Sequence, residues 1–168
     1  MTLTVEEAVS DDVSGLASVI QAGFADAPSA LVHYGEFAVD LERLVSDALR
    51  LRRERGHHVF TARVSRRIVG GARLAPREFA RSSHIATITL LIDPVARGRG
   101  YGRTLLEAVT QRALESSSVE RLDMRVVASD IALRALVEDC GWAIGRRELE
   151  AVATAAGLKD LLIYTRDR

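Results

Sequence analysis

The sequence predicts a single α/β (α+β) domain with a mixed central sheet of about seven strands flanked by about four helices. Its 168 residues are 48% hydrophobic, and a chain of this length buries roughly 70% of the surface exposed in its unfolded state. Apolar residues alternate in some segments and recur at helical spacing in others, which predicts the order βααβββαβαββ. Neither a repeat nor a linker divides the chain, so we expect one domain over residues 1–168.

The first elements are a strand and two helices. Residues 3–9 have a strand pattern, and Ser10 is expected to cap a helix with Asp11 and Asp12 in its first turn. This helix would bury the apolar residues Val13, Leu16, Ala17 and Ile20. Residues 25–37 contain a proline and a glycine and are expected to form a loop. A second helix follows, with one apolar face formed by Leu41, Leu44, Val45 and Ala48.

Three consecutive strands come next. Residues 57–64 and 67–75 are separated by a link short enough for a hairpin. Residues 84–92 are rich in β-branched side chains, and Pro94 ends this strand because proline cannot donate a hydrogen bond to a sheet.

The last third of the chain alternates helices and strands. A third helix is indicated by apolar residues at helical spacing, namely Leu105, Leu106, Val109, Ala113 and Leu114. Residues 121–127 then read as a strand, residues 130–140 as a helix that Gly141 ends, and residues 142–152 and 159–165 as two strands. The strand, helix and strand around residues 97–103 predict a right-handed crossover between parallel strands.

Composition excludes several classes of function. Lys plus Arg equals Asp plus Glu at 23 each, so no overall field favours nucleic acid or an anionic membrane. No leader-like segment or run of about 20 apolar residues is present, so we expect a soluble, cytoplasmic protein without membrane contact. The single cysteine, Cys140, agrees with a reducing compartment and is expected to be a small buried side chain.

The stretch RGRGYGR at residues 97–103 combines glycines with arginines at the start of the third helix. Glycines at 98, 100 and 102 would let main-chain N–H groups approach a phosphate, and Arg97, Arg99 and Arg103 could add charge-assisted hydrogen bonds. A dinucleotide fingerprint fails because Arg103 stands where its third glycine belongs, and a Walker A loop fails because no lysine follows Gly102. On these residues alone, a glycine-rich turn with solvated arginines fits equally well.

Residues 97–102 also resemble the Q/R-x-x-G-x-G/A motif of the GNAT superfamily, the acyl-CoA-dependent N-acyltransferases. The motif follows LLIDP at 90–94, as it follows LxVxP in that family. LVEDCGW at 136–142 is similar to the family's LYEKLGF, and residues 145–164 resemble its frequent ending GRxREA…DGxxxDxxxM. The resemblance covers nearly the whole chain and implies a sheet splayed at a coenzyme A cleft.

The resemblance also implies a cofactor site. Leu90, Leu91 and Ile92 would offer main-chain hydrogen bonds to the pantetheine arm and the acyl carbonyl. The main chain at the start of the third helix would hold the pyrophosphate, through Arg97, Gly98, Arg99, Gly100, Tyr101, Gly102 and Arg103. Asp130 stands where many members begin the fourth helix with asparagine. The co-substrate would be acetyl-CoA or another short acyl-CoA, without a metal.

Two groups that commonly move protons in the family are missing. The tyrosine that protonates the leaving sulfur falls at Val137, and the glutamate on the strand before the loop falls at Ala86. At pH 7 a lysine-like amine is about 0.04% neutral and an α-amine roughly 14% neutral, so an acceptor with an α-amine depends less on an enzymatic base. We therefore favour α-amines.

Substitutes for the missing groups are available. Tyr34, Glu36 and the neighbouring His33 lie in the predicted loop, a region that lines the acceptor site in the family, although a solvated loop explains them as well. His84 shares strand parity with Ile92 and could act as a base through water, while an edge histidine without a role is the simpler interpretation. His57 and His58 point to opposite faces without a partner at ligand spacing, which argues against a metal site.

The leading hypothesis is an enzyme that moves an acyl group directly from acyl-CoA to a primary amine of a small molecule or amino acid. The alternative is a GNAT-like module that binds coenzyme A as a sensor with little or no turnover, which Val137 and Ala86 favour. Nucleic acid binding through residues 97–103 conflicts with the zero net charge. The sequence is compatible with a homodimer, and it leaves the acceptor and the acyl length open.

Overall fold

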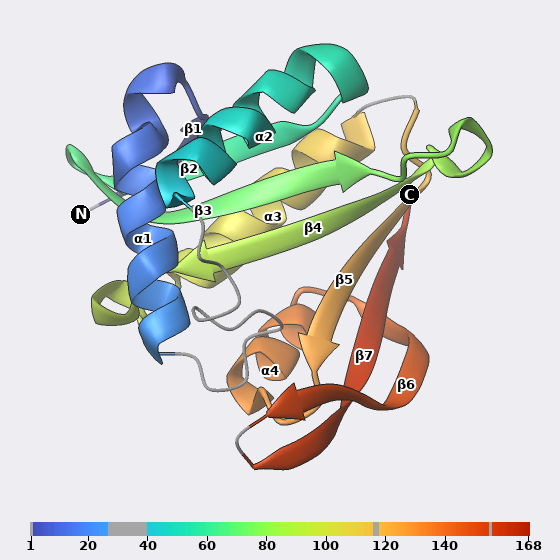
Figure 1. Cartoon of the computed structure of the whole chain (residues 1–168). Coiled ribbons are helices and arrows are strands. Elements are labelled where there is room, and N and C mark those ends of the chain that lie inside the picture. The colour runs from blue at the N-terminus through green and yellow to red at the C-terminus, as the bar shows by residue number, and fades with distance from the viewer. Residues whose placement is uncertain (1, 27–39, 116–117, 155) are drawn as a thin grey trace.

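A computed structural model of the chain describes residues 2–26, 40–115, 118–154 and 156–168. Its centre is a seven-stranded mixed sheet in the order β1-β2-β3-β4-β5-β7-β6. In Figure 1, helices α1 and α2 lie in front of the sheet and α3 lies behind it. This arrangement confirms the predicted fold class and the predicted element order.

The N-terminal part consists of β1 (Leu3–Glu7), α1 (Val13–Asp26) and α2 (Leu41–Arg55). The prediction that Ser10 caps the first helix is wrong, because residues 10–12 form a separate 3-10 turn before α1. Asp12 is the residue that closes this turn. Its carboxylate accepts a hydrogen bond from the N–H of Val9 at 3.0 Å and pairs with Arg63, which satisfies a charge that is 95% buried.

The middle of the chain forms β2 (His58–Val64), β3 (Arg67–Pro76) and β4 (Ile85–Ile92). β2 and β3 form the predicted antiparallel hairpin, and β4 pairs antiparallel with β3. Val59 of β2 packs with α1 and α2, whereas Ile88 and Ile92 of β4 lie in the core cluster beneath α3. The alternation along each strand therefore separates two helical layers.

The C-terminal part contains α3 (Tyr101–Glu115), β5 (Arg121–Val127), α4 (Ile131–Asp139), β6 (Ala143–Thr154) and β7 (Gly157–Asp167). β5 is parallel to β4, as the crossover pattern predicts. β7 lies between β5 and β6, so β6 is an edge strand, and most of its residues are exposed. A register shift interrupts β6 between Glu148 and Val152, where Glu150 has a φ of +50°.

The sheet opens between β4 and β5. These strands pair over only three positions, from Ile85 opposite Arg121 to Thr87 opposite Asp123. Beyond that point β4 remains paired with β3 as far as Ile92, and β5 remains paired with β7 as far as Val127. The two strands diverge toward their carboxyl ends (Figure 1), which confirms the predicted splay.

The largest core lies between the sheet and α3. Three residues of α3 are fully buried there, Leu105, Leu106 and Val109. Residues of α4 and β7 extend the same cluster toward the C-terminal strands, including Val137 and Tyr164. Within the described ranges, no helix is both long enough and apolar enough to cross a membrane.

Two adjacent glycines in β3 allow close packing on both faces of the sheet. A Cβ added at Gly70 would lie 2.5 Å from Cδ1 of Ile92 and 2.9 Å from the main-chain oxygen of Leu91. A Cβ added at Gly71 would lie 2.6 Å from Cδ2 of Leu16 in α1. The end of β4 that borders the splay is thus held against β3 at van der Waals distance.

We predict that Gly70→Ala lowers the free energy of unfolding by about 1–3 kcal/mol, because the main-chain oxygen of Leu91 cannot move away without disturbing the β3–β4 ladder. Urea denaturation measures this loss. Gly15→Ala in α1 is the control: its Cβ would meet only the flexible end of Ile68, and alanine favours a helix, so stability should stay within about 1 kcal/mol of wild type. An equal loss in both variants would contradict the argument.

Candidate active site

The connection between β4 and α3 exposes a row of main-chain N–H groups. Gly98 and Gly100 have φ values of +73° and +79°, and the residues between and beside them have negative φ. Alternation of the sign of φ turns successive N–H groups toward one side, which is a backbone arrangement that can bind an anion. In the described chain, the N–H groups of residues 98–103 donate no hydrogen bond, and the first helical bond of α3 joins the N–H of Thr104 to Gly100.

The three glycines of this loop serve two different purposes. A Cβ at Gly98 or Gly100 would meet no atom within 4 Å, so these glycines are needed for their left-handed conformation and leave open space beside the N–H groups. Gly102 is helical, and its Cβ would lie 3.2 Å from Cδ2 of Leu136 in α4. The third glycine thus allows α3 to approach α4.

The arginines around the loop have separate partners. Arg97 donates from Nε to the main-chain oxygen of Ile92 at 3.2 Å, which places its side chain at the end of β4. Arg103 pairs with Asp139 at the end of α4 at 2.9 Å. Arg99 is exposed, and Tyr101 packs against the core cluster. Of the three predicted anion ligands, Arg103 is therefore engaged by a carboxylate of the protein itself.

The main chain of β4 alternates between two directions. The N–H of Asp93 donates to Val69 and the N–H of Arg77 donates to Ile85, so odd-numbered residues of β4 face β3 with both main-chain groups. Leu91 follows this pattern and pairs with Gly71. Even-numbered residues face the opposite side, where β5 has diverged.

Leu90 and Ile92 therefore direct main-chain groups into the splay, and Leu91 does not. The oxygen of Ile92 accepts the hydrogen bond from Arg97, while no hydrogen bond in the described chain uses the N–H of Leu90 or Ile92. The side chain of Leu91 packs against Gly23 of α1. Of the three residues predicted to offer main-chain hydrogen bonds, two have the required direction.

The positions that lack the expected acid and base are buried in the core. Ala86 and Val137 are both 0% exposed. Neither side chain has an ionisable group, and neither position is accessible to solvent. A proton at the splay must therefore be moved by water or by a group elsewhere.

Tyr164 of β7 lies close to the point where the strands diverge. It is opposite Met124, the first residue of β5 beyond the ladder with β4. Its side chain is fully buried, and its hydroxyl donates to Oε1 of Glu138 in α4. Burial raises the pKa of the Tyr164 phenol, and the hydrogen bond to Glu138 raises it further.

The remaining predicted site residues are dispersed. His84 is exposed, and its main-chain oxygen accepts hydrogen bonds from Glu120 and Arg121 at the end of the sheet where β4 and β5 are still paired. It is eight residues before Ile92, which corresponds to about 26 Å along a strand, so the structure does not bring the two together. Asp130 caps α4 by accepting from the N–H of Leu133 at 3.0 Å. His33, Tyr34 and Glu36 lie outside the described residues.

Polar residues on the α1 side of the sheet were missed by sequence reasoning. Arg73, Thr89 and Arg125 occupy odd-numbered positions next to the splay, and all three are exposed. Asp123 lies on the same face and is 5% exposed. Their signal in the sequence is a polar residue between apolar neighbours of a strand, as in GARLA, and charged residues at alternate positions, as in RLDMRVV.

The two adjacent histidines have different partners. Nδ1 of His57 lies 2.9 Å from Nη2 of Arg73, and Nδ1 of His58 lies 2.6 Å from Oε1 of Glu7. Their side chains therefore lie on opposite faces of the sheet, as expected. Among the described residues, no group of three or more His, Cys, Asp and Glu side chains is placed to hold a metal ion.

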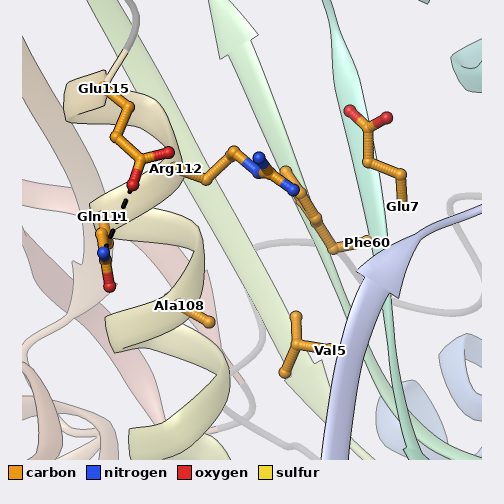
Figure 2. A pocket seen from close by; sticks show the side chains of 7 residues that line it. All are labelled: Val5, Glu7, Phe60, Ala108, Gln111, Arg112 and Glu115. Carbon is orange, nitrogen blue, oxygen red and sulfur yellow. Dashed lines mark hydrogen bonds between the residues drawn. The ribbon is translucent and has the colours of Figure 1, made fainter.

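Two shallow polar pockets lie away from residues 97–103. One, of about 230 Å³, lies between β1 and the C-terminal half of α3; Figure 2 shows its lining residues Val5, Glu7, Phe60, Ala108, Gln111, Arg112 and Glu115. The other, of about 290 Å³, lies where α1 meets the start of α2 and includes Asp40 and Glu42. Asp40 caps α2 there, which gives this acidic residue a structural role.

Comparisons with known proteins agree with this geometry. The family model described as the acetyltransferase (GNAT) family matches residues 25–142. A comparison with curated protein sequences finds no match to this chain.

Several solved structures share the fold over almost the whole chain. A ribosomal-protein-alanine N-acetyltransferase from Brucella melitensis has a TM-score of 0.86 at 24% identity, with 98% of this chain and 99% of that chain covered. A phosphinothricin acetyltransferase from Sinorhizobium meliloti in complex with acetyl-CoA has a TM-score of 0.88 at 16% identity, with 99% and 89% covered. An N-acetyltransferase from Staphylococcus aureus Mu50 has a TM-score of 0.87 at 14% identity, with 99% of both chains covered.

We predict that the stability of the protein falls on the alkaline side and that Tyr164→Phe weakens this dependence. The folded state holds the phenolic proton more tightly than the unfolded state, so this stabilisation is present below about pH 10 and is lost as the pH rises through the raised pKa. Denaturant titrations at a series of alkaline pH values measure it.

The control for this experiment is Tyr101→Phe, which removes a hydroxyl with no hydrogen bond in the described structure. Above about pH 10 the wild type should lose its stability advantage over Tyr164→Phe, whereas Tyr101→Phe should follow the wild type. Parallel curves for all three proteins would show that Tyr164 does not titrate with unfolding.

Proposed function

This chain belongs to the GNAT acetyltransferase family, and from that premise we propose that it transfers an acetyl or other short acyl group from acyl-CoA to a primary amine. The acceptor is a small molecule or amino acid, and residues 1–168 form a single catalytic domain. The row of unpaired N–H groups at residues 98–103 is the observation that carries this proposal.

The pyrophosphate of acyl-CoA suits the concave loop before α3. Unpaired N–H groups and the positive end of the helix dipole both attract an anion at the N-terminus of a helix. Arg97 and Arg99 add positive charge next to these groups, while Arg103 contributes its main-chain N–H. The loop thus combines main-chain donors, open space and charge.

The splay suits the arm that carries the acyl group. The main-chain groups of Leu90 and Ile92 that lost their strand partner offer hydrogen bonds to the amides of that arm. A main-chain N–H at the same edge can stabilise the negative charge that develops on the acyl oxygen during transfer. The edge of β4 therefore both positions the thioester and supplies an oxyanion donor.

The reaction forms an amide without a covalent enzyme intermediate. The neutral amine attacks the carbonyl carbon, the new C–N bond forms as the C–S bond breaks, and the amine loses a proton to water while the departing thiolate gains one. Because Ala86 and Val137 supply no proton carrier, the rate depends on orientation and on the oxyanion donor. An α-amine with a pKa of about 7.8 suits this arrangement because roughly 14% of it is neutral at pH 7.

The second candidate function is a module that binds coenzyme A without turnover. Its support is that the side chains of Ala86 and Val137 supply no acid or base at either position. Detection of free thiol across a panel of amines with acetyl-CoA separates the two candidates. Release with at least one amine supports the enzyme, whereas coenzyme A binding without release under any acceptor supports the module.

We predict that Gly100→Val abolishes binding of coenzyme A. A branched side chain strongly disfavours the φ of +79°, and its Cβ would fill the open space beside the N–H groups. Isothermal titration calorimetry with coenzyme A measures the affinity.

Gly157→Val is the matched control for this variant. Gly157 has a φ of +90° and a Cβ there would also meet no atom within 4 Å, but it is the first residue of β7 and pairs with Thr154 of β6. The two variants should lose similar stability, and only Gly100→Val should lose coenzyme A. Unchanged affinity in Gly100→Val would refute the proposed phosphate site.

A further inference from the structure

Exposed arginines flank the splay on one face of the sheet. This is the face in front of which Figure 1 shows α1 and α2. Arg73 of β3 is directly opposite Thr89 of β4, and two residues earlier Thr87 is opposite Asp123 of β5. Residues directly opposite share a face and alternate residues return to it, so Arg125 lies on this face as well. We call this surface the arginine face; it consists of Arg73, Arg77, Thr89 and Arg125.

Most charges on and around the arginine face are paired within the protein. The carboxylate of Asp123 accepts a hydrogen bond from Arg77 at 2.8 Å and lies 3.4 Å from Nε of Arg121. Arg125 lies 3.9 Å from Glu148. These pairs leave an excess of positive charge beside the splay.

Arg73 is the exception, because no ion pair joins it to a carboxylate of the described residues. Its Nη2 donates to Nδ1 of His57 at 2.9 Å. A guanidinium has no acceptor, so Nδ1 must be unprotonated and the ring neutral when this bond forms. His57 is 6% exposed and thus holds the guanidinium in place without neutralising it. The other N–H donors of Arg73 are available to an anion.

An anion bound at Arg73 would lie near the edge of β4 that faces the splay. Side chains directly opposite in an antiparallel pair have Cβ atoms about 4.5–5.5 Å apart, and Thr89 immediately precedes Leu90, whose main chain faces the splay. A carboxylate matches the two parallel donors of a guanidinium. In an α-amino acid, carboxylate and amine share one carbon, so binding the first at Arg73 brings the second to the edge of β4.

We propose that the acceptor is a free α-amino acid whose carboxylate binds Arg73 on the arginine face, with His57 positioning the guanidinium. This proposal rests on the acyl transfer proposed above and specifies its acceptor. It also explains how an amine becomes a nucleophile without a base at residue 86 or 137. A paired carboxylate no longer stabilises the neighbouring ammonium, and the excess positive charge on and around the arginine face lowers the pKa of that ammonium further.

The test compares α-amino acids with their carboxamides as acceptors, because the amide keeps the amine and removes the anion. In wild type the acids should be preferred. Arg73→Gln should raise KM for the acids at least about tenfold and leave KM for the carboxamides within about twofold, as expected for loss of a charge-assisted pair. Arg73→Lys keeps the charge without the two parallel donors and should recover part of the preference.

The dependence of kcat on pH provides a second readout. If Arg73 lowers the pKa of the bound amine, the rise of kcat with pH should move to higher pH in Arg73→Gln. A purely structural role of Arg73 would leave this profile unchanged. The other charged groups on and around this face remain in every variant: Arg77, Arg121, Asp123, Arg125 and Glu148.

The matched control is Arg66→Gln. Arg66 is exposed in the turn between β2 and β3 and makes no ion pair in the described structure. This variant should behave as wild type with both classes of acceptor. Thermal unfolding of all variants establishes that they are folded.

Calorimetry with α-amino acids, in the presence of saturating coenzyme A, separates this proposal from the proposed function. If wild type binds α-amino acids, Arg73→Gln does not, and no amine is turned over, the amino acid site would be supported and the enzyme refuted. Turnover of carboxamides as readily as acids, or an equal loss for both in Arg73→Gln, would support the enzyme and overturn the amino acid site. Absence of both binding and turnover would overturn both.

Discussion

The early end of the β4–β5 ladder is the constraint on which the site depends. Main-chain polar groups in a sheet are satisfied by the neighbouring strand, and a strand that loses its neighbour must satisfy them with water or a ligand. After Thr87 and Asp123 this happens in the interior of the sheet and not at its edge. Groups that can bind a ligand are therefore presented at the centre of the molecule, supported on both sides by intact ladders.

The neighbouring elements reinforce this opening. Gly70 and Gly71 hold the unpaired end of β4 tightly against β3, and Gly102 lets α3 begin close to α4. The side chain of Arg97 reaches back to Ile92, which links the loop to the end of the strand. The loop before α3 and the strand edge are consequently connected, and the φ values of two glycines set the direction of the N–H groups in the loop.

Sequence patterns predicted the elements well because their signals are local. The alternation in residues 84–92 and the helical spacing from Leu105 to Leu114 each reflect burial against one neighbour, and both elements are present in the structure. The cap at Ser10 was mispredicted because the buried pair of Asp12 and Arg63, distant in sequence, determines the local turn. Tertiary contacts overrode a local preference.

Only the part of the candidate site that depends on main-chain conformation was predicted from the sequence. The glycines of residues 98–102 are recognisable because backbone conformation restricts residue type, whereas the direction of Leu91 follows from pairing with β3. The arginine face depends on register between strands: nothing local relates Arg73 to Thr89 or to Arg125. His84 was placed by parity alone, and its distance along the strand from Ile92 removes it from the splay.

The irregular edge formed by β6 limits how the molecule can associate. A straight, exposed edge strand invites further strands to add to it, and such growth leads to aggregates. Here the positive φ of Glu150 breaks the hydrogen-bonding repeat, and charged side chains surround it at Arg146, Arg147 and Glu148. Continuous sheets built from many copies are thereby disfavoured along this long, solvent-facing border.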